Sequence, residues 1–437
     1  MNLLKNIFKG DKVVWMIFLF LCLISIVEVF SAAATLTYKS GDHWGPITQH
    51  AAMLLAGVAL VVAMHNIPYK WFQMFPVFIY PLSTVLLAIV LVLGIISGDR
   101  INGAARWMTF MGFQFQPSEL AKMAVVIATA FILAKRQDEK GASPKAFKYI
   151  LMLTGVVLVL IAPENLSTAI LLFAVVCMMM FIGRVAAKKL WGMLGILALV
   201  GVIGVGTLLA VPAKTWNEIP GLHRASTWRG RIVKFVDNEE VPAAKFNIDK
   251  EAQVAHARIA VASSNFLGVG PGNSVQRDFL SQAFSDFIFA IVIEEMGLAG
   301  GIFVVFLYIC LLVRAGRIAN KCARTFPAFL VMGIALLLVS QALLNMMVAV
   351  GLFPVTGQPL PLISKGGTST LVNCVYIGMI LSVSRYTVLL DEQKAHDAQI
   401  QLQIENMGNP DAQEGTEPTA KVLNSDATFE DEEENSD

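Results

Sequence analysis

Ten long runs of apolar residues follow one another along the chain, each separated from the next by a polar stretch. Most of these runs approach the roughly 20 residues that an α-helix needs to cross the hydrocarbon core of a bilayer. The pattern therefore predicts an all-α polytopic membrane protein with ten transmembrane helices. The predicted helices lie at residues 13–35, 51–66, 75–97, 118–135, 147–162, 165–183, 190–211, 286–313, 326–350 and 369–390.

The composition agrees with this pattern and excludes an ordinary soluble domain. Apolar residues make up 56% of the 437 positions and charged residues 15%, whereas a typical soluble domain is about 45–50% apolar and about 25% charged. The first apolar run follows Lys5, Lys9 and Lys12, but it is longer than the roughly 7–15 apolar residues of a signal peptide. We therefore predict that it is a permanent helix.

Basic residues fall unevenly on the two sides of the predicted helices. With the N-terminus in the cytoplasm, the cytoplasmic flanks hold 16 Lys and Arg residues and the opposite loops hold 4. Because an excess of Lys and Arg marks the cytoplasmic side, the sequence predicts that both termini are cytoplasmic. The long segment 212–285 is then a large extracytoplasmic loop.

The C-terminal segment 391–437 differs from the rest of the chain, because it carries 14 acidic and only 2 basic residues. A segment this acidic and this poor in apolar residues does not form a packed core by itself. We predict a membrane domain at 1–390 followed by a disordered cytoplasmic tail, with a short helix near 392–404. A role of the tail in docking a partner is the alternative.

The predicted extracytoplasmic loop is too long for a simple connection, since loops beyond about 15 residues are usually functional or disordered. Its residue pattern predicts a helix at 249–266 and a glycine-rich turn at 268–272. Arg229 and Arg231 are two positions apart, so they would share a face in an extended segment but not on a helix.

Two polar stretches border predicted helices on the outer side. In the first, we expect Ser118 to cap the fourth helix, Glu119 to lie in its first turn and Lys122 to follow one turn later, where a surface lysine could reach the membrane interface. In the second, Asp286 lies at the start of the eighth helix, where a helix cap is the alternative to a catalytic role.

Glu294 and Glu295 lie two turns deeper in the eighth predicted helix. An unpaired carboxylate at that depth would be costly. We therefore predict that one of them pairs with a basic residue from a neighbouring helix, with Lys122 as the first candidate. Structural charge compensation and catalysis remain alternatives.

A third polar stretch, 351–369, holds three prolines and four glycines, which prevent a regular helix. Irregular backbone at membrane depth is tolerated where it is buried in protein or lines a cavity. Lys365 and the amides of Gly366 and Gly367 precede a helix N-terminus, an arrangement that suits an anionic group. A plain connecting loop is the alternative.

In this order and on ten predicted helices, these stretches resemble the SEDS family, the FtsW/RodA/SpoVE proteins of bacterial cell-wall synthesis. The resemblance covers roughly residues 13–388 and is closer to the FtsW branch, which acts in cell division, than to the RodA branch. The matching segments are 103–107, 116–122, 229–231 with Phe235, 253–272, 286–290, 294–297 and 351–369.

The resemblance implies an inverting peptidoglycan glycosyltransferase that polymerises lipid II at the outer face of the cytoplasmic membrane and releases undecaprenyl diphosphate. Asp286 matches the essential aspartate of the family, and we expect it to act as the general base. The residues expected to bind substrate are Arg106, Glu119, Lys122, Arg229, Arg231, Lys365, Gly366 and Gly367, with Glu294 and Glu295 in support.

Two positions depart from the family pattern. The usual acidic residue at the start of the sixth helix is either Glu164 or replaced by Asn165, so we assign this position no role. Lys365 stands where the family usually has tyrosine, and it adds a cation.

The resemblance also implies partners and a location. A class B penicillin-binding protein would cross-link the strands, other division proteins would accompany it at the septum of the cytoplasmic membrane, and no nucleic acid is expected. We expect a divalent cation, Mg²⁺ or Mn²⁺, shared with the substrate diphosphate, and no organic cofactor. A lipid II flippase and a non-catalytic division scaffold are the alternatives, although the outer position of the polar stretches differs from the midplane site typical of a transporter.

Overall fold

The computed structural model describes residues 9–40, 45–96, 107–110, 113–138, 141–212, 215–216, 223–236, 248–280 and 285–408. The chain divides into two compact units, Met1–Thr387 and Val388–Asp437. The elements in chain order are α2 (Lys12–Ser40), α3 (Gly45–Asn66), η1 (Tyr69–Gln73), α4 (Phe75–Ile96), β1 (Met108–Phe110), β2 (Phe113–Phe115), α5 (Pro117–Lys135), β3 (Gln137–Asp138), β4 (Gly141–Ala142), α6 (Pro144–Ile161), α7 (Leu166–Ile182), α8 (Ala187–Ala210), α10 (His223–Val236), α11 (Ile248–Ser263), η3 (Gln276–Phe279), α12 (Ile288–Lys321), α13 (Thr325–Ala349) and α14 (Gly367–Gly408).

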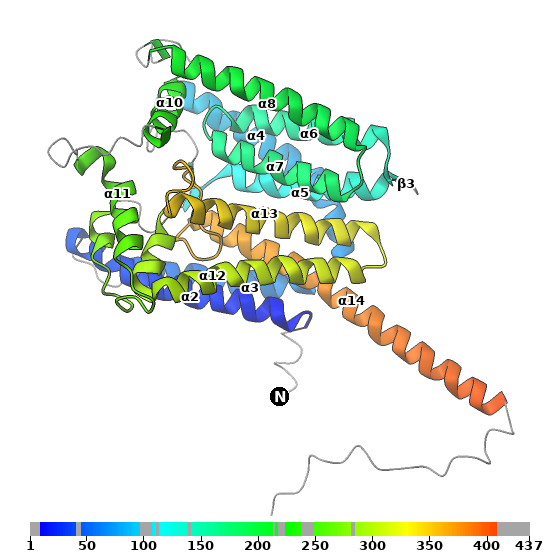
Figure 1. Cartoon of the computed structure of the whole chain (residues 1–437). Helices are drawn as coiled ribbons and strands as arrows, with labels where there is room; N and C mark the ends of the chain where they lie inside the picture. The colour runs from blue at the N-terminus through cyan, green and yellow to red at the C-terminus, as the bar shows by residue number, and fades with distance from the viewer. Residues whose placement is uncertain are drawn as a thin grey trace, which may run out of the picture. The chain divides into compact units, whose positions relative to one another are not determined.

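The long helices of the first unit lie side by side along a common direction (Figure 1). In one group, helices α4 to α8 pack on one another in chain order. In the other group, α2 contacts both α3 and α12, and α12 also contacts α13. Helix α13 joins the groups through contacts with α5 and α7. For this reason α5 and α13 are central helices. Of the residues in their apolar spanning stretches, 78% are buried in α5 and 61% in α13. The two short hairpins, β1–β2 and β3–β4, are antiparallel.

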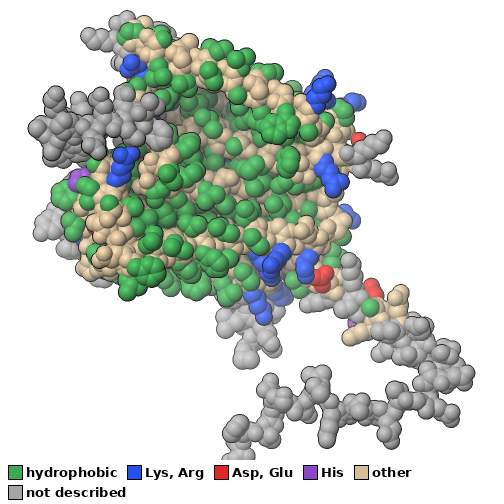
Figure 2. Space-filling model, in the orientation of Figure 1, with side chains coloured by type: hydrophobic (Ala, Val, Ile, Leu, Met, Phe, Trp, Pro, Cys, Tyr) green, Lys and Arg blue, Asp and Glu red, His purple; other side chains and the backbone are tan. Residues whose placement is uncertain are grey.

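The outer surface of this bundle is apolar, as lipid contact requires. Within the described residues, nine helices are long and apolar enough to cross a membrane, and α7 is a shorter apolar helix of 17 residues. The spanning window of α8 has no buried residue, and Figure 2 shows apolar side chains over the flank of the bundle. The predicted all-α polytopic fold is confirmed, since a helix lies at each of the ten predicted segments. The count of ten spans stays a prediction.

Lys and Arg side chains gather at the end of the bundle opposite α10 and α11 (Figure 2). This end carries the β3–β4 hairpin between α5 and α6 and the turn between α12 and α13. The distribution agrees with a cytoplasmic side at that end. The cytoplasmic location of both termini stays a prediction.

The starts of two helices differ from what the sequence suggested. Helix α5 begins at Pro117, with Gln116 in the N-cap position and no side-chain cap, because proline at the first position has no N–H that needs a partner. The predicted cap by Ser118 is therefore wrong, although Glu119 does lie in the first turn. Helix α12 begins at Ile288, again without a side-chain cap, so the cap alternative for Asp286 is not observed.

Two predicted segments can be compared with the structure near their ends. Helix α11 confirms the helix expected at 249–266, although it ends at Ser263. Helix α14 continues to Gly408, beyond the short helix expected near 392–404. Residues 409–437 lie outside the described residues, so the disordered tail and the boundary at 390 stay predictions.

Helix α12 is broken at Gly297, where a φ of 73° and a ψ of −178° interrupt the helical backbone. The glycine-rich turn lies directly against this break. A Cβ atom on Gly297 would be 2.3 Å from the carbonyl oxygen of Phe266 and 2.4 Å from the amide nitrogen of Gly268. Gly268 itself has a φ of 74°, and positive φ values in this segment confirm the predicted turn.

Replacing Gly297 by alanine should therefore destabilise the protein by about 2 kcal/mol or more, because the backbone conformation is one that only glycine adopts readily and the added methyl group meets main-chain atoms. Gly316→Ala is the matched control, since it lies in the same helix and a Cβ there meets nothing within 4 Å. That control should be neutral or slightly stabilising. Thermal unfolding in detergent measures both, and equal midpoints for Gly297→Ala and wild type would contradict the close contact.

Candidate active site

Most of the predicted site residues meet at the end of the bundle that carries α10 and α11. At this end α5, α12 and α14 begin and α13 ends. The amide of Gln116 donates a hydrogen bond to Thr368 Oγ1 at 3.3 Å, and Asn345 Nδ2 donates to the carbonyl oxygen of Asp286 at 3.0 Å. The first predicted cation, Arg106, lies outside the described residues.

Asp286 is half-buried and is held by a set of hydrogen bonds around the start of α12. Besides the contact with Asn345, Ser364 Oγ donates to the carbonyl oxygen of Ser285 at 2.8 Å. Ser285 Oγ in turn donates to Asp286 Oδ1 at 2.7 Å. These bonds tie the segment before α12 to α13 and to loop 351–366, so the carboxylate has a defined position.

Arg231 on α10 interacts electrostatically with Asp286. Burial lowers the pKa of the Arg231 guanidinium, while the charge of Asp286 acts in the opposite direction and raises it. Arg229 lies on the same helix, and its Nε is buried without a hydrogen-bond partner among the described residues. The two arginines therefore lie on a helix and do not share a face, so only Arg231 is assigned to the side of Asp286.

Lys122 lies inside the bundle and does not reach the membrane interface. It is fully buried, and its Nζ is 2.9 Å from Glu119 Oε1 and 2.9 Å from Gln341 Oε1. The surface alternative for this lysine is therefore wrong, because α5 is a central helix. Its predicted contact with substrate stays a prediction.

Loop 351–366 is anchored by polar side chains of the helices around it. Gln341 Nε2 donates to the carbonyl oxygen of Pro359 at 3.0 Å, and Asn345 Nδ2 donates to that of Gln358 at 2.8 Å. Gln358 Nε2 donates to Thr168 Oγ1 at 2.6 Å. The C-terminal part of the loop, residues 356–364, is thus largely buried and held by the surrounding helices, whereas Leu352 and Phe353 are exposed.

Lys365 ends this loop next to the N-terminus of α14. It is half-buried, and burial lowers the pKa of its ammonium group. Helix α14 begins at Gly367, so its first amides, which have no partner within a helix, adjoin the lysine and Gly366. A partly dehydrated cation beside a helix N-terminus offers a strong field for an anionic group.

Glu294 and Glu295 are buried, and the basic residue that pairs with Glu295 is different from the one expected. Arg277 Nη1 is 3.7 Å from Glu295 Oε1, and Arg277 belongs to the segment between α11 and α12. Glu295 therefore has a basic partner, as predicted, but the prediction that this partner comes from a neighbouring transmembrane helix, with Lys122 as the first candidate, is wrong, because Lys122 pairs with Glu119.

The position that departs from the family pattern has a structural role. Asn165 is the N-cap of α7, and its side chain accepts a hydrogen bond from the amide of Thr168 at 3.3 Å. Glu164 is buried and lines a small cleft with Ser118 and Asn165. Asn165 therefore performs the capping that an aspartate would perform at the same place.

Gln341 and Asn345 are the site residues that the sequence reasoning missed. They lie one turn apart on α13, are almost fully buried, and anchor both the loop and the start of α12. The sequence did contain a signal for them, namely two amide side chains one turn apart in an otherwise apolar run. Polar groups in a membrane helix usually face the bundle interior and find partners there.

The described residues contain no group of three or more His, Cys, Asp or Glu side chains that could hold a metal ion. The donor set at Asp286 consists of one carboxylate beside a guanidinium, which does not fit a metal held by protein alone. We therefore derive no step through a metal, and the shared divalent cation stays a prediction.

The fold and this polar cluster define a polytopic helical membrane protein whose candidate chemistry lies at one end of the bundle. A family model described as cell cycle protein, which covers FtsW, RodA and SpoVE, matches residues 11–389. The chain therefore belongs to this family, and the resemblance seen in the sequence is confirmed.

Individual relatives agree with the family match. The chain is 32% identical over 368 residues to the probable peptidoglycan glycosyltransferase FtsW of Nitrosomonas europaea, covering 82% of this chain and 89% of that protein. It is 32% identical over 378 residues to the protein of the same name from Geobacter sp. strain M18, covering 86% and 96%.

Solved structures agree with the fold. A chain from a peptidoglycan synthase complex that coordinates polymerization and crosslinking has a TM-score of 0.66 and 24% identity, covering 86% of this chain and 98% of that one. The rod shape determining protein RodA of Thermus thermophilus has a TM-score of 0.59 and 23% identity, covering 87% and 98%.

Proposed function

We propose that this chain is a peptidoglycan glycosyltransferase that polymerises lipid II at the outer face of the cytoplasmic membrane, for septal synthesis in cell division. The observation that carries the proposal is the Asp286 carboxylate, which hydrogen bonds hold in place at the polar end of the bundle, within electrostatic range of Arg231. The curated relatives are named probable peptidoglycan glycosyltransferase FtsW, which supports both the reaction and the division role.

In this reaction the 4-hydroxyl of the acceptor sugar attacks the anomeric carbon of the growing strand. Asp286 accepts the hydroxyl proton as the new C–O bond forms. The bond to the diphosphate breaks, and undecaprenyl diphosphate leaves from the opposite side, which inverts the configuration. A diphosphate is a good leaving group once cations neutralise it, so no protein acid is required.

Cations and amides at the same end of the bundle would bind that diphosphate. Arg231 lies within electrostatic range of Asp286, and Lys365 adjoins Gly366 and the first amides of α14. Charged donors in a partly dehydrated site bind phosphate oxygens more strongly than they would in water. We assign Arg231, Lys365, Gly366 and Gly367 to the diphosphate.

Arg231→Ala should lower the rate of lipid II polymerisation about 10- to 100-fold, since a hydrogen bond to a charged group contributes about 1.5–3 kcal/mol. Lys188→Ala, an exposed change at the start of α8, is the control and should leave the rate unchanged. Polymer formation and binding of labelled lipid II are measured on both variants. A wild-type rate in Arg231→Ala would remove this residue from the site.

A class B penicillin-binding protein is the proposed partner, and it would cross-link the strands that this chain makes. Support comes from the structural neighbour, which belongs to a peptidoglycan synthase complex that coordinates polymerization and crosslinking. Location at the division septum, with other division proteins, follows from the same proposal.

The proposed function is tested by reconstituting the chain with its cognate transpeptidase and labelled lipid II in vesicles. Formation of glycan strands supports the glycosyltransferase. Exposure of lipid II from the inner leaflet without polymer would establish the flippase instead. If neither polymer nor exposure is observed, the chain is a non-catalytic scaffold.

A further inference from the structure

The break in α12 at Gly297 is filled by the extracytoplasmic segment 265–270. The amides of Val269 and Gly270 donate to the carbonyl oxygens of Glu294 and Glu295 at 3.0 and 2.8 Å. Beyond the break, the amides of Leu298 and Ala299 donate to the carbonyl oxygens of Asn265 and Phe266 at 3.2 and 3.1 Å. The segment therefore supplies the main-chain partners that the interrupted helix lacks.

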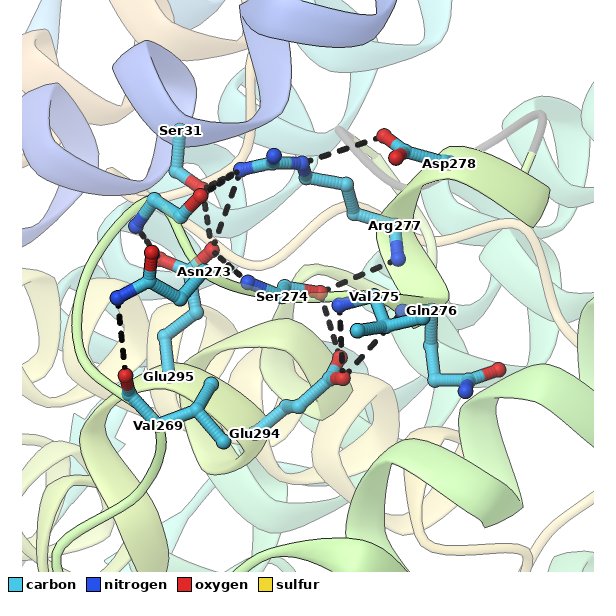
Figure 3. Close-up of polar contacts among 11 residues, drawn as sticks. Ser31, Val269, Asn273, Ser274, Val275, Gln276, Arg277, Asp278, Glu294 and Glu295 are labelled. Atoms are coloured by element: carbon cyan, nitrogen blue, oxygen red, sulfur yellow. Dashed lines mark hydrogen bonds and ion pairs between the residues drawn. The ribbon is translucent and has the colours of Figure 1, made fainter.

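The carboxylate of Glu294 accepts hydrogen bonds from residues 274–276, which follow this segment (Figure 3). Its Oε1 accepts hydrogen bonds from the amides of Val275 and Gln276 at 3.0 and 3.3 Å. Its Oε2 accepts from Ser274 Oγ at 2.5 Å. Each carboxylate oxygen is therefore occupied, and the residue is only 4% exposed.

The carboxylate of Glu295 is held in a different way. Its Oε2 accepts from the amide of Gly272 at 3.0 Å, and its Oε1 accepts from the amide of Ser274 at 3.4 Å. Ser31 Oγ, from α2, also donates to Oε1. Both oxygens thus accept from main-chain N–H groups, and the residue is fully buried.

Arg277 completes this arrangement on the side of α2. Its Nη1 donates to Ser31 Oγ at 2.8 Å and to the carbonyl oxygen of Gly272 at 2.9 Å, and it lies 3.7 Å from Glu295 Oε1. A buried carboxylate is costly without a cation and hydrogen-bond donors. Arg277 provides the cation, and it joins the segment to a second helix.

The segment 288–296 of α12 is consequently fixed at both ends. At its start, Asn345 and Ser364 hold the carbonyl oxygens of Asp286 and Ser285. At its end, the two carboxylates and the main-chain bonds across the break hold the extracytoplasmic loop. A displacement at the break would therefore move the carboxylate of Asp286 relative to Arg231.

We propose that Glu294, Glu295 and Arg277 are positioning residues, which clamp segment 265–277 onto the broken helix α12 and thereby keep Asp286 in place for the reaction. This proposal rests on the proposed function. The two glutamates act through Asp286 and do not touch the substrate, since their carboxylate oxygens are buried and occupied by protein donors. Arg277 acts with them, because its Nη1 donates to Ser31 Oγ and to the carbonyl oxygen of Gly272.

The two carboxylates respond differently to an amide, and this difference gives the sharpest test. Glu294→Gln can keep the two main-chain bonds on Oε1, while its new amide group donates to Ser274 Oγ. Glu295→Gln places an N–H₂ group against a main-chain N–H, because both oxygens of Glu295 are acceptors of such groups. We expect Glu294→Gln to keep polymerisation within about threefold of wild type and Glu295→Gln to lose about tenfold or more in kcat.

Alanine variants and a control complete the experiment with the full-length protein and labelled lipid II. Glu294→Ala should lower kcat about tenfold or more while the KM for lipid II stays within about threefold, since the lost contacts position the base and do not bind substrate. Hydrogen exchange of the amides of 272–276 should be faster in this variant. Asp278→Ala is the control, because Asp278 also contacts Arg277 but its side chain is 54% exposed.

The outcomes separate this proposal from the function on which it rests. Absence of polymer with wild-type protein would contradict the proposed function itself. Polymer with wild-type protein but equal losses in Glu294→Gln and Glu295→Gln would overturn the clamp and indicate a role of the charge in catalysis. Unchanged exchange of 272–276 in Glu294→Ala would overturn it as well. If the alanine variant does not fold, the comparison of the two glutamine variants still decides.

Discussion

Asp286→Asn should produce a protein that folds, enters the membrane and binds its partner, but makes no glycan strands. Asparagine has nearly the same size and can still accept the hydrogen bond from Ser285 Oγ. The contact of Asn345 is made to the main-chain carbonyl group and does not depend on the side chain. What the amide cannot do is accept the proton of the attacking hydroxyl, and general base catalysis typically contributes about 10²–10⁴-fold.

The control for this prediction is Asp278→Asn, which changes an exposed aspartate in the segment that precedes α12. Polymer formation from labelled lipid II is measured for both variants, together with thermal unfolding and co-purification of the transpeptidase. We expect the control to match wild type in all three. Near wild-type polymerisation by Asp286→Asn would show that this carboxylate is not the base.

The fold could be predicted from the sequence to a large extent because lipid imposes one requirement on every spanning segment. Helices such as α8, which has no buried residue in its spanning window, appear in the sequence as uninterrupted apolar runs. The break in α12 could not be predicted. Gly297 is one of three glycines within five residues, with Gly300 and Gly301, and only Gly297 has non-helical dihedral angles inside α12. The break depends on the close approach of Gly268, which only the tertiary structure brings about.

The site could be predicted less completely, and the errors have a common cause. Asp286 and Arg231 were identified by family motifs, and the charge of Asp286 acts on the guanidinium of Arg231 in the structure. The surface alternative for Lys122 was wrong because α5 is a central helix, and the sequence of α5 alone does not show which helices surround it. Likewise, Arg277 was missed as the partner of Glu295, because a loop residue reached the carboxylate instead of a neighbouring helix.

The pair Lys122–Glu119 leads to the second large effect, which concerns stability. Lys122→Met should destabilise the protein by about 3–5 kcal/mol, because it leaves the carboxylate of Glu119 buried without its cation. Glu119 has little compensation available, since its Oε2 has no hydrogen-bond partner among the described residues and the residue is 3% exposed. Lys135→Met is the matched control, because Lys135 lies on the same helix but is exposed.

Removing both charges together should recover much of this loss. In the double variant Glu119→Gln, Lys122→Met no ion remains buried, and replacing a buried ion pair by neutral groups is often close to neutral in stability. Thermal unfolding of the two single variants and the double variant in the same detergent gives the coupling between the residues. If the two single losses simply added, they would give an expected free energy of unfolding for the double variant. We expect the measured value to exceed that sum by at least about 2 kcal/mol. Additive effects would contradict a coupled buried pair, and they would mean that Glu119 becomes protonated or hydrated when Lys122 is removed.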